Sequence, residues 1–457
     1  MIESKNELIT EFNKLTLKIN DESVIVRGFI DTIKTFSKNM IFVILRDRLE
    51  KVQCVVLRKQ VNDFDSINKI PLESFVKVTG KAVEVKTEIK SCTIKNREIR
   101  VETLEVVSSI SAQLPFSIKD ASSKGTDRAN VSYNVRLDNR FLDFRVPTTY
   151  AFVKLLDGVM SGFRTYLKSE DFTEIRTTKI IQSGSEGGAN LFSIDYFGKK
   201  AFLAQSSQLY KQSCIAGGMK RVFEIGYAYR AEVQNVNRYL SEFTQVDIEM
   251  EIENDYMDVI RFVHKVILHV IKYLKEHYSR ELEIVREYTD FKDVELSTEP
   301  VIIDHSEGVD ILKAQGYEID YEDDFNREQE KALGAHIKKL HNVDLFVIKD
   351  YPKSQRAFYT QVCKGTNKTR SYDFLLRGEE ILSGAQRETD FESLKNAIAE
   401  KGVNVDGLDF YLKMFKFAVP PHGGVGIGLE RFCKCLFETN DIRPFSLFPR
   451  DPSRLYP

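Results

Sequence analysis

The spacing of apolar residues changes partway along this 457-residue chain, and the change predicts two different folds. Between residues 20 and 110, short β-branched runs recur at close spacing. They are SVIVRGFI (23–30), MIFVILRD (40–47), KVQCVVL (51–57), SFVKVTGKAVEV (74–85) and EIRVETLEVV (98–107). Such runs predict a small β-barrel or sandwich. A five-stranded OB-type barrel fits this length, and oligonucleotides are common ligands of that fold.

The pattern is lost over residues 111–135, where a proline, a glycine and several serines indicate a linker. From Tyr150 the apolar residues repeat at a helical period, and a second long helix is predicted at 257–278. Strand-like runs lie between and after these helices, at 199–205, 221–232, 241–251, 372–384 and 423–430. Strands joined by irregular loops predict an α+β domain with an antiparallel sheet. The expected organisation is a barrel at 1–110, a hinge at 111–135 and an α+β domain at 136–457.

The bulk composition excludes several classes of protein. The 66 Lys and Arg residues are balanced by 68 Asp and Glu, so the chain as a whole is not a polybasic nucleic-acid binder. No run approaches the roughly 18 apolar residues that span a membrane, and the charged first residues leave no core for a signal peptide. The six cysteines and seven histidines are scattered, which supports neither a zinc site nor a disulfide framework. We therefore expect a cytoplasmic protein with reduced thiols.

Three segments of the second domain carry candidate chemistry. The first is YRAEVQNVNRYLSEFTQVDIEM (229–250), in which two strand-like halves flank a polar loop. Its charged and aromatic residues are Arg230, Glu232, Arg238, Glu242 and Phe243. A charged residue deep in a strand is costly without a partner. By itself, this segment fits a cross-strand ladder of ion pairs as well as it fits a ligand site.

The other two segments are HGGVGIGLERFCKCLF (422–437) and RGEEILSGAQRE (377–388). Glycines in a strand allow a ligand to approach closely, but a bulge or tight packing is the usual cause. The first string is neither a dinucleotide-binding nor a Walker A motif. In the second, Glu380 and Ser383 could hold Mg²⁺, while Arg387 could clamp a carboxylate. Taken alone, a capped helix start explains that spacing better.

Together the three segments resemble motifs 2 and 3 and the substrate strand of the class II aminoacyl-tRNA synthetases. The strings EFTQVDIEM, EEILSGAQR, GIGLERF and SLFPRDPSRLYP look like the aspartyl-tRNA synthetases of the archaeal/eukaryotic type, in the same order. The upstream QSSQLYKQ (205–212) and SGSEGGANLF (183–192) also resemble that family. The resemblance covers nearly the whole chain. It implies an N-terminal OB-fold anticodon-binding barrel followed by a class II catalytic domain, an antiparallel sheet flanked by helices.

The resemblance also implies a reaction. Such an enzyme activates L-aspartate with ATP and Mg²⁺ to aspartyl-adenylate and pyrophosphate, and then transfers aspartate to the 3′-terminal adenosine of tRNA(Asp). It would act as a homodimer without a membrane partner. The residues matching the family's catalytic groups are Arg230, Arg431 and Glu380.

Further roles follow from matching positions. Adenine would lie between Phe243 and Arg431, Arg230 would bind the α-phosphate, and Glu380 and Ser383 would be the Mg²⁺ ligands. The residues implied for ATP are Arg230, Glu232, Arg238, Tyr239, Leu240, Phe243, Glu380, Gly428, Leu429, Glu430 and Arg431. Those implied for aspartate are Glu186, Gln208, Lys211, Arg230, Ser383 and Arg387. Lys211 and Arg387 would hold its side-chain carboxylate, and Glu186 would sense its α-amino group.

On the barrel, Phe42 and Gln53 match the family's anticodon-reading pair, a stacking ring and a base-edge amide. The alternative is a core phenylalanine and a surface glutamine. Three positions depart from the family pattern. Thr178 replaces the motif 1 proline at the dimer interface, Tyr239 replaces a histidine, and Ser207 replaces a proline.

Asparaginyl- and lysyl-tRNA synthetases share this architecture and remain alternatives. Lys211 argues against asparagine, since we expect a second buried cation to lack a partner when the substrate is an amide. A non-catalytic RNA-binding or scaffold protein derived from a synthetase would be expected to lose motif residues, which are present here. Whether tRNA(Asn) is charged as well stays open.

Overall fold

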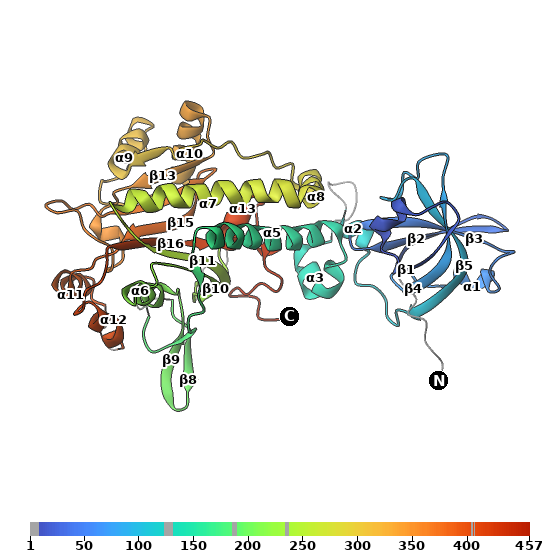
Figure 1. Cartoon of the computed structure of the whole chain (residues 1–457), viewed down its shortest axis with the longest axis horizontal. Helices are drawn as coiled ribbons and strands as arrows, with labels where there is room; N and C mark the ends of the chain where they lie inside the picture. Colours follow the sequence, from blue (N-terminus) through green and yellow to red (C-terminus); the bar gives the residue numbers. More distant parts are fainter. Residues whose placement is uncertain (1–8, 123–130, 185–189, 234–236, 404, 406) are drawn as a thin grey trace. The chain divides into compact units, whose positions relative to one another are not determined.

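The β-branched runs of the first 110 residues close into a five-stranded barrel with the strand order β1-β2-β3-β5-β4 (Figure 1). The strands are β1 Glu22–Ser37, β2 Met40–Asp47, β3 Glu50–Leu57, β4 Phe75–Glu84 and β5 Arg97–Ser108. Alternate residues point inward, as the two-residue period of a strand requires. Ile41, Val43 and Leu45 of β2 are therefore fully buried in the barrel core. The predicted barrel is confirmed.

The computed structural model describes residues 9–122, 131–184, 190–233, 237–403, 405 and 407–457. The chain divides into two compact units, Met1–Tyr150 and Ala151–Pro457. The first unit therefore continues beyond the barrel. The segment predicted as a linker contains α2 (Ile118–Ala121) and the start of α3 (Tyr133–Asp138), which is followed by α4 (Arg140–Asp143). Apolar residues of the described part of this segment pack with Leu142 and Val146 in a small core.

An eight-stranded sheet forms the centre of the second unit, with the order β12-β13-β14-β15-β16-β11-β10-β6. Its strands are β6 Thr173–Glu174, β10 Arg221–Tyr229, β11 Glu242–Glu251, β12 Ile302–Asp304, β13 Leu345–Lys349, β14 Ser371–Leu376, β15 Glu379–Gln386 and β16 His422–Gly428. The neighbours from β13 to β10 are antiparallel, and only the two edge pairs are parallel. The prediction of an α+β domain with an antiparallel sheet is confirmed.

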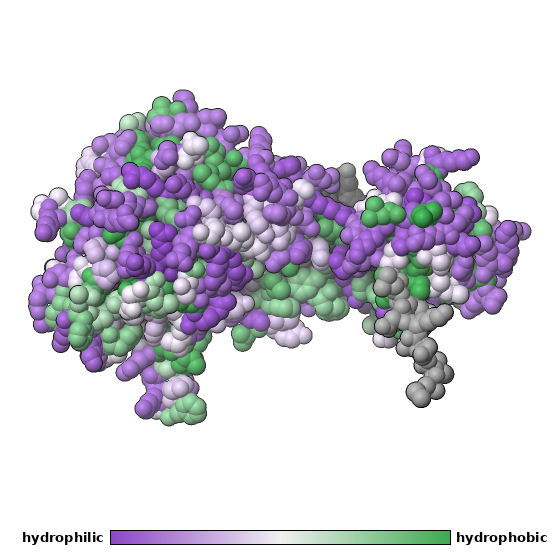
Figure 2. Space-filling view, in the orientation of Figure 1, coloured by the Kyte–Doolittle hydropathy of each residue, from purple (hydrophilic) through white to green (hydrophobic). Residues whose placement is uncertain are grey.

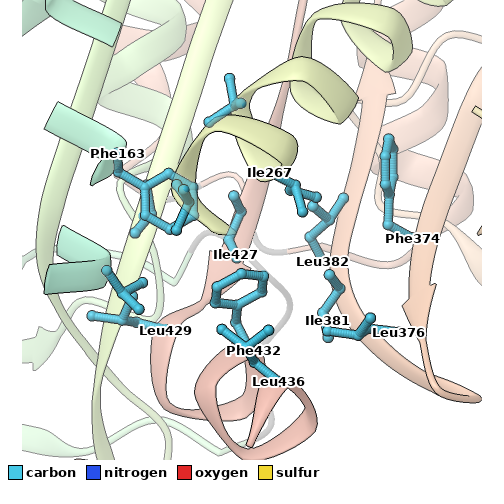
Figure 3. Packing of buried hydrophobic residues seen from close by; sticks show 14 of the residues in the cluster. Phe163, Ile267, Phe374, Leu376, Ile381, Leu382, Ile427, Leu429, Phe432 and Leu436 are labelled. Carbon is cyan, nitrogen blue, oxygen red and sulfur yellow. The ribbon is translucent and has the colours of Figure 1, made fainter. Parts of the chain in front are cut away.

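The helices of this unit pack in three separate apolar cores. They are α5 Pro147–Ser169, α6 Gln208–Ala216, α7 Tyr256–His277, α8 Ser279–Thr289, α9 His305–Ala314, α10 Arg327–His341, α11 Phe391–Glu400, α12 Asp409–Met414 and α13 Leu429–Leu436. Figure 3 shows Phe163 of α5, Ile267 of α7 and Phe432 of α13 around Ile427 of β16 and Leu382 of β15. This core fills one face of the sheet with side chains of α5, α7, α8 and α13. On the opposite face, α9 and α10 cover β12, β13 and β14 through a core of their own, and polar side chains gather on β11, β15 and β16.

A small sheet of the second unit has the order β7-β9-β8, with β7 Ile180–Ile181, β8 Ser193–Tyr196 and β9 Lys199–Leu203. Most of the face seen in Figure 2 is hydrophilic, and hydrophobic colour appears at the tip of the β8–β9 hairpin, where Phe197 is 92% exposed. Within the described part of the chain, none of the helices combines the length and apolar composition that a membrane span requires.

Candidate active site

A pocket of about 300 Å³ opens on the polar face of the central sheet. It is lined by residues of β11, β15, β16 and α13 and of the loop after β10. The predicted residues that line it are Gln208, Arg230, Glu232, Arg238, Tyr239, Leu240, Phe243, Glu380, Ser383, Arg387, Gly428, Glu430 and Arg431. Leu429 instead packs in the apolar core (Figure 3). Glu186 lies outside the described residues.

Strand β11 supplies one wall through its alternation. Val246 and Ile248 are buried in the core, so Asp247 between them faces the opposite side. Phe243 and Gln245 line the pocket from this side. Of the two strand-like halves proposed for segment 229–250, the second is confirmed as β11. The first is wrong, because β10 ends at Tyr229 and residues 230–233 follow that strand.

Strand β15 places the two predicted Mg²⁺ ligands, Glu380 and Ser383, on one face by means of a β-bulge. On β14, Phe374 pairs with Leu382 and the next residue, Leu375, pairs with Glu380, so Ile381 is an extra residue. Ile381 and Leu382 both face the core. The bulge thereby leaves Glu380 and Ser383, three positions apart, on the pocket side. The alternative of a capped helix start is wrong, because the helix-like spacing comes from the bulge.

The glycines of β16 make room for neighbouring backbone and side-chain atoms of the protein itself. A Cβ added to Gly424 would lie 2.0 Å from the carbonyl oxygen of Ile248 and 2.3 Å from Oε2 of Glu249. One added to Gly426 would lie 2.3 Å from Nε2 of Gln245. At Gly428 the nearest atom would be 3.7 Å away. Tight packing therefore explains Gly424 and Gly426, and only Gly428 offers the open approach to a ligand that the sequence suggested.

Unpaired donors converge on this pocket. Among the described residues, the buried atoms without a hydrogen-bond partner include Nε of Arg230, Nε of Arg238, Nε of Arg356 and Nε2 of Gln208. All four residues line the pocket. A buried donor without an acceptor costs about 1–3 kcal/mol. Three of these donors belong to guanidinium groups, so the pocket is suited to an anion that accepts several hydrogen bonds at once.

Aromatic rings accompany two of the arginines. The guanidinium carbon of Arg230 lies 5.4 Å from the ring centroid of Phe243, and that of Arg431 lies 5.6 Å from the ring centroid of Tyr239. Both distances are within the range of cation–π attraction. Phe243 and Arg431 line the same pocket, as the predicted adenine slot requires.

The acidic part of the pocket is formed by the β14–β15 hairpin. Burial and the neighbouring carboxylate of Asp373 raise the pKa of Glu380, while Arg431 and Arg356 oppose the rise. Arg356 donates to both oxygens of Asp373, at 2.9 and 2.6 Å, and to Oγ of Ser383 at 2.9 Å. A further cation would relieve the repulsion between the two carboxylates.

Few protein ligands are available for a metal there. In the described ranges no group of three or more His, Cys, Asp or Glu side chains could hold a metal ion. Glu380 and Ser383 still fit Mg²⁺, because this ion usually takes one or two protein oxygens together with substrate phosphates and water. The nearest cation to the Glu380 carboxylate is Arg431, at 3.9 Å.

A buried ion network lies beside the pocket. Lys211 donates to Oδ1 of Asp247 at 2.8 Å and to the carbonyl of Val425 at 2.9 Å, and its Nζ is 3.4 Å from Oε2 of Glu249. Arg387 donates to the two oxygens of Glu249 from Nε at 2.8 Å and from Nη2 at 3.0 Å. Burial alone would raise the pKa of Glu249, but Arg387 and Lys211 hold it below its usual value.

This network corrects one argument from the sequence. Lys211 has two carboxylate partners within the protein, so an amide substrate would not leave it without one. Lys211 also does not line the pocket, whereas Arg387 does. Sequence reasoning missed Asp247 and Glu249, although their alternation with Phe243 and Gln245 in one strand was the signal that could have found them.

Other residues had no sequence signal. Asp373 reaches the site because it pairs with Ser383 across the β14–β15 hairpin, and Arg356 comes from the loop before β14. Glu330 of α10 accepts a hydrogen bond from Nη2 of Arg238 at 3.3 Å and another from the backbone N–H of Glu380 at 3.2 Å. These contacts join segments that are far apart in the sequence.

The two residues predicted to read the anticodon lie on the outer face of the barrel. Phe42 and Gln53 alternate with buried neighbours on β2 and β3 and are themselves half-buried, so Phe42 is not a core residue. Nε2 of Gln53 donates to Oε2 of Glu98 at 3.0 Å. Thr178, which follows β6, is exposed, and Ser207 is buried directly before α6.

Comparison with known proteins gives a consistent picture. Residues 132–452 match the family model "tRNA synthetases class II (D, K and N)", and residues 24–107 match "OB-fold nucleic acid binding domain". The chain is 50% identical to "Probable aspartate--tRNA ligase, cytoplasmic" of Enterocytozoon bieneusi, over 99% of this chain and 97% of that protein. It is 36% identical to "Aspartate--tRNA ligase, cytoplasmic" of Homo sapiens, over 100% and 92%.

Solved structures agree with the sequence relatives. The aspartyl-tRNA synthetase from Entamoeba histolytica superposes with a TM-score of 0.91 at 32% identity, covering 99% of this chain and 94% of that one. Asparaginyl-tRNA synthetase from Pyrococcus horikoshii complexed with asparaginyl-adenylate superposes with a TM-score of 0.86 at 28% identity, covering 100% of both chains. The fold is thus common to both branches, and identity is higher to the aspartate branch.

Proposed function

Because the chain belongs to the class II tRNA synthetases of the D, K and N group, we propose that its pocket binds ATP and L-aspartate on the residues described above. The chain is an enzyme that ligates aspartate to tRNA, as its full-length relatives do. Those relatives are named cytoplasmic, and we assign this chain to the same compartment. The overall reaction joins aspartate to tRNA(Asp) and converts ATP to AMP and pyrophosphate.

The observation that carries the assignment of the pocket is its set of unpaired donors. Buried Nε groups of Arg230 and Arg238 lack acceptors among the described residues, and a triphosphate supplies several. We assign Arg230 to the α-phosphate and Arg238 to the more distal phosphates. The adenine ring would stack between Phe243 and Arg431, with Glu232 at its edge. The remaining ATP contacts would come from Tyr239, Leu240, Gly428 and Glu430, and from the backbone of Leu429.

We assign the Mg²⁺ ligands to Glu380 and Ser383. These two side chains share a pocket face because of the bulge at Ile381. When bound, Mg²⁺ would neutralise charge on the phosphates of ATP. Arg356 would act on the protein side by holding the Ser383 hydroxyl and the Asp373 carboxylate in place.

The activation step needs positioning rather than a base. An oxygen of the aspartate α-carboxylate attacks the α-phosphorus, and the bond from that phosphorus to the pyrophosphate oxygen breaks. The attacking group is already ionised, so no proton has to be removed. Arg230 is placed to stabilise the negative charge that gathers on the α-phosphate. Holding the two substrates in line supplies most of the remaining acceleration.

Aspartate would meet one cation directly. Arg387 lines the pocket and uses Nε and Nη2 for Glu249, so the rest of its guanidinium fork is the part available to a substrate carboxylate. Nε2 of Gln208 has no hydrogen-bond partner among the residues that the structure describes, and it would donate to the same substrate. We propose that Glu186 binds the α-amino group of aspartate. Lys211 would act indirectly, by holding Asp247 and Glu249 in position.

The remaining assignments concern tRNA and assembly. We propose domains at 1–110, 111–135 and 136–457 as anticodon-binding barrel, hinge and catalytic domain. On the barrel, Phe42 would stack an anticodon base of tRNA(Asp), and Gln53 would read a base edge. We also propose a homodimer. Thr178 is exposed after β6, where the family's interface proline stands, so its side chain is accessible to a second copy.

The test is ATP–pyrophosphate exchange with aspartate, asparagine and lysine in parallel. We expect exchange with aspartate alone. Stronger exchange with asparagine or lysine would assign the chain to the asparaginyl- or lysyl-tRNA synthetases. Exchange with none of the three amino acids would favour a non-catalytic RNA-binding protein. Charging of tRNA(Asp) and tRNA(Asn) transcripts by the same preparation would then establish whether one or both are substrates.

A further inference from the structure

An exposed phenylalanine lies beside the proposed anticodon-reading ring. On the β1–β2 hairpin, Thr35 pairs with Ile41, but the next pair is Ser37 with Met40. Phe36 is therefore an extra residue of β1, which is the definition of a β-bulge. A bulge turns its extra side chain out of the regular alternation. Phe36 is 66% exposed, at a hairpin tip where all residues from Lys34 to Asn39 are exposed.

The ring of Phe36 is placed next to the ring of Phe42. Their centroids are 5.5 Å apart and the ring planes are inclined by 60°. A flat base cannot lie on two faces inclined by that angle, so the two rings offer two separate stacking surfaces. Lys34, which pairs with Phe42 across the hairpin, is exposed and forms no ion pair among the residues that the structure describes. The surface thus joins aromatic faces to a free positive charge.

We propose that Phe36 is a second base-stacking residue of the barrel, which takes an unpaired base of the tRNA anticodon loop next to the base on Phe42. This inference rests on the proposed role of Phe42. Single-stranded nucleic acid is bound by this combination of aromatic faces and positive charge. An apolar protein surface would gain hydrophobic contact with the two rings, but it would have to bury the ammonium group of Lys34 without a compensating negative charge. The bulged ring adds contact area and is tolerant of base identity, whereas Gln53 and Glu98 carry hydrogen-bonding groups.

The chain contains no tryptophan, which makes a direct reporter available. The Phe36→Trp variant carries a single indole at this surface. Titration with the isolated anticodon stem-loop of tRNA(Asp) should change its fluorescence strongly, because a stacked base quenches an indole. An RNA duplex of the same length, which has no unpaired bases, should leave it nearly unchanged. Leu17→Trp is the matched control, since Leu17 is 82% exposed and lies outside the strands of the barrel.

Kinetics give the second readout. Phe36→Ala should lower kcat/KM for tRNA(Asp) in aminoacylation by about 5- to 150-fold, the effect of losing one stacked base. Phe36→Tyr should retain most of the native value, and Leu17→Ala should retain all of it. Thermal unfolding of Phe36→Ala should match the native protein, because the side chain is mostly in solvent. A drop in melting temperature equal to that of a core substitution would overturn the inference by showing a structural role.

The Phe42→Ala variant shows whether a negative result contradicts the anticodon-binding role of the barrel or only the role of Phe36. If Phe42→Ala leaves tRNA charging intact, the proposed role of the barrel surface is wrong and the inference falls with it. If Phe42→Ala impairs charging while Phe36→Ala does not, and the Phe36→Trp indole ignores the stem-loop, only the inference is wrong. An indole that responds equally to the duplex would also overturn it, since phosphate attraction would then explain the signal.

Discussion

Lys211 donates a hydrogen bond to Oδ1 of Asp247 over 2.8 Å, and neither side chain is more than 5% exposed. Glu249 lies within 3.4 Å of the same ammonium group and also receives two hydrogen bonds from Arg387. Two cations and two carboxylates are thus balanced before any substrate binds. Removal of one member leaves buried charge unpaired, whichever amino acid is in the pocket.

We therefore predict that Lys211→Met acts on stability. Loss of the ammonium group leaves Asp247 and Glu249 with uncompensated charge, and breaking a buried pair from one side costs about 3–5 kcal/mol. Urea denaturation should show a free energy of unfolding lower by this amount. Lys265→Met, at an exposed position of α7, is the control and should have the same free energy of unfolding as the native protein. A fully stable Lys211→Met that has lost only its preference for aspartate would instead mean that Lys211 contacts the substrate.

Arg387→Lys tests the cation that lines the pocket. The substitution keeps a positive charge beside Glu249 but removes the planar fork, which donates to Glu249 from Nε and Nη2 while its remaining N–H groups face the substrate. We expect kcat/KM for aspartate in pyrophosphate exchange to fall by about 100-fold, from a lost charge-assisted interaction of about 3 kcal/mol. The value for asparagine should fall less. Unchanged selectivity between the two amino acids would place the specificity pocket elsewhere.

Glu380→Gln tests the metal assignment. Burial and Asp373 raise the pKa of Glu380, so ionisation of this side chain is less favourable in the free protein than in water, and a neutral amide should not destabilise the fold. Adenylate formation should be abolished across all Mg²⁺ concentrations, while the melting temperature stays at or above the native value. Glu392→Gln, at an exposed position of α11, should leave both unchanged. Near-native exchange by Glu380→Gln would remove this residue from the site.

The sequence was sufficient to predict the barrel and the antiparallel sheet, because β-branched and apolar runs at close spacing indicate strands such as β2 and β11. It was insufficient at β15. The bulge at Ile381 makes residues three apart share a face, which imitates the spacing of a helix. Only pairing with β14 reveals the extra residue. The same pairing brings Asp373 opposite Ser383, and no motif in the sequence signals that contact.

The long-range charge network was beyond sequence reasoning for a related reason. Lys211 stands in the string QSSQLYKQ, which resembles the synthetase family, and the resemblance pairs its charge with the carboxylate of aspartate. Its actual partner depends on how α6 packs against β11, since Asp247 competes for the same ammonium group. Charge type can be read from a sequence, but the choice between an internal partner and a ligand requires the tertiary structure.

Thr178 leads to a prediction about assembly. The proposed homodimer does not depend on a proline at this position, because α5 and its neighbouring strand would supply most of the interface. Light scattering at micromolar concentration should give twice the mass of one chain, 105.4 kDa from 52.7 kDa each. Thr178→Pro should leave that mass unchanged. A stable monomer for the native chain that becomes a dimer in Thr178→Pro would show that the missing proline decides assembly.

Glu430 should make the stability of the protein depend on pH. Both of its carboxylate oxygens accept a hydrogen bond from the backbone N–H of Thr244, at 2.8 and 3.0 Å, yet the side chain is only 3% exposed. Burial is the largest influence and raises the pKa to about 7. The folded protein therefore holds this proton more tightly than the unfolded chain, whose carboxyl has an ordinary pKa near 4.5.

The direction of the pH effect on stability follows from this difference between the folded and unfolded pKa of Glu430. Because the folded pKa is the higher one, the stabilisation is fully present below about pH 4.5 and is lost as the pH rises to about 7. The loss is on the order of 3 kcal/mol for a rise of this size. Glu430→Gln keeps an oxygen for the Thr244 N–H and cannot ionise. The melting temperature of Glu430→Gln minus that of the native protein should therefore be larger at pH 8 than at pH 5. An equal difference in melting temperature at both pH values would show that Glu430 is ionised throughout and that burial does not raise its pKa.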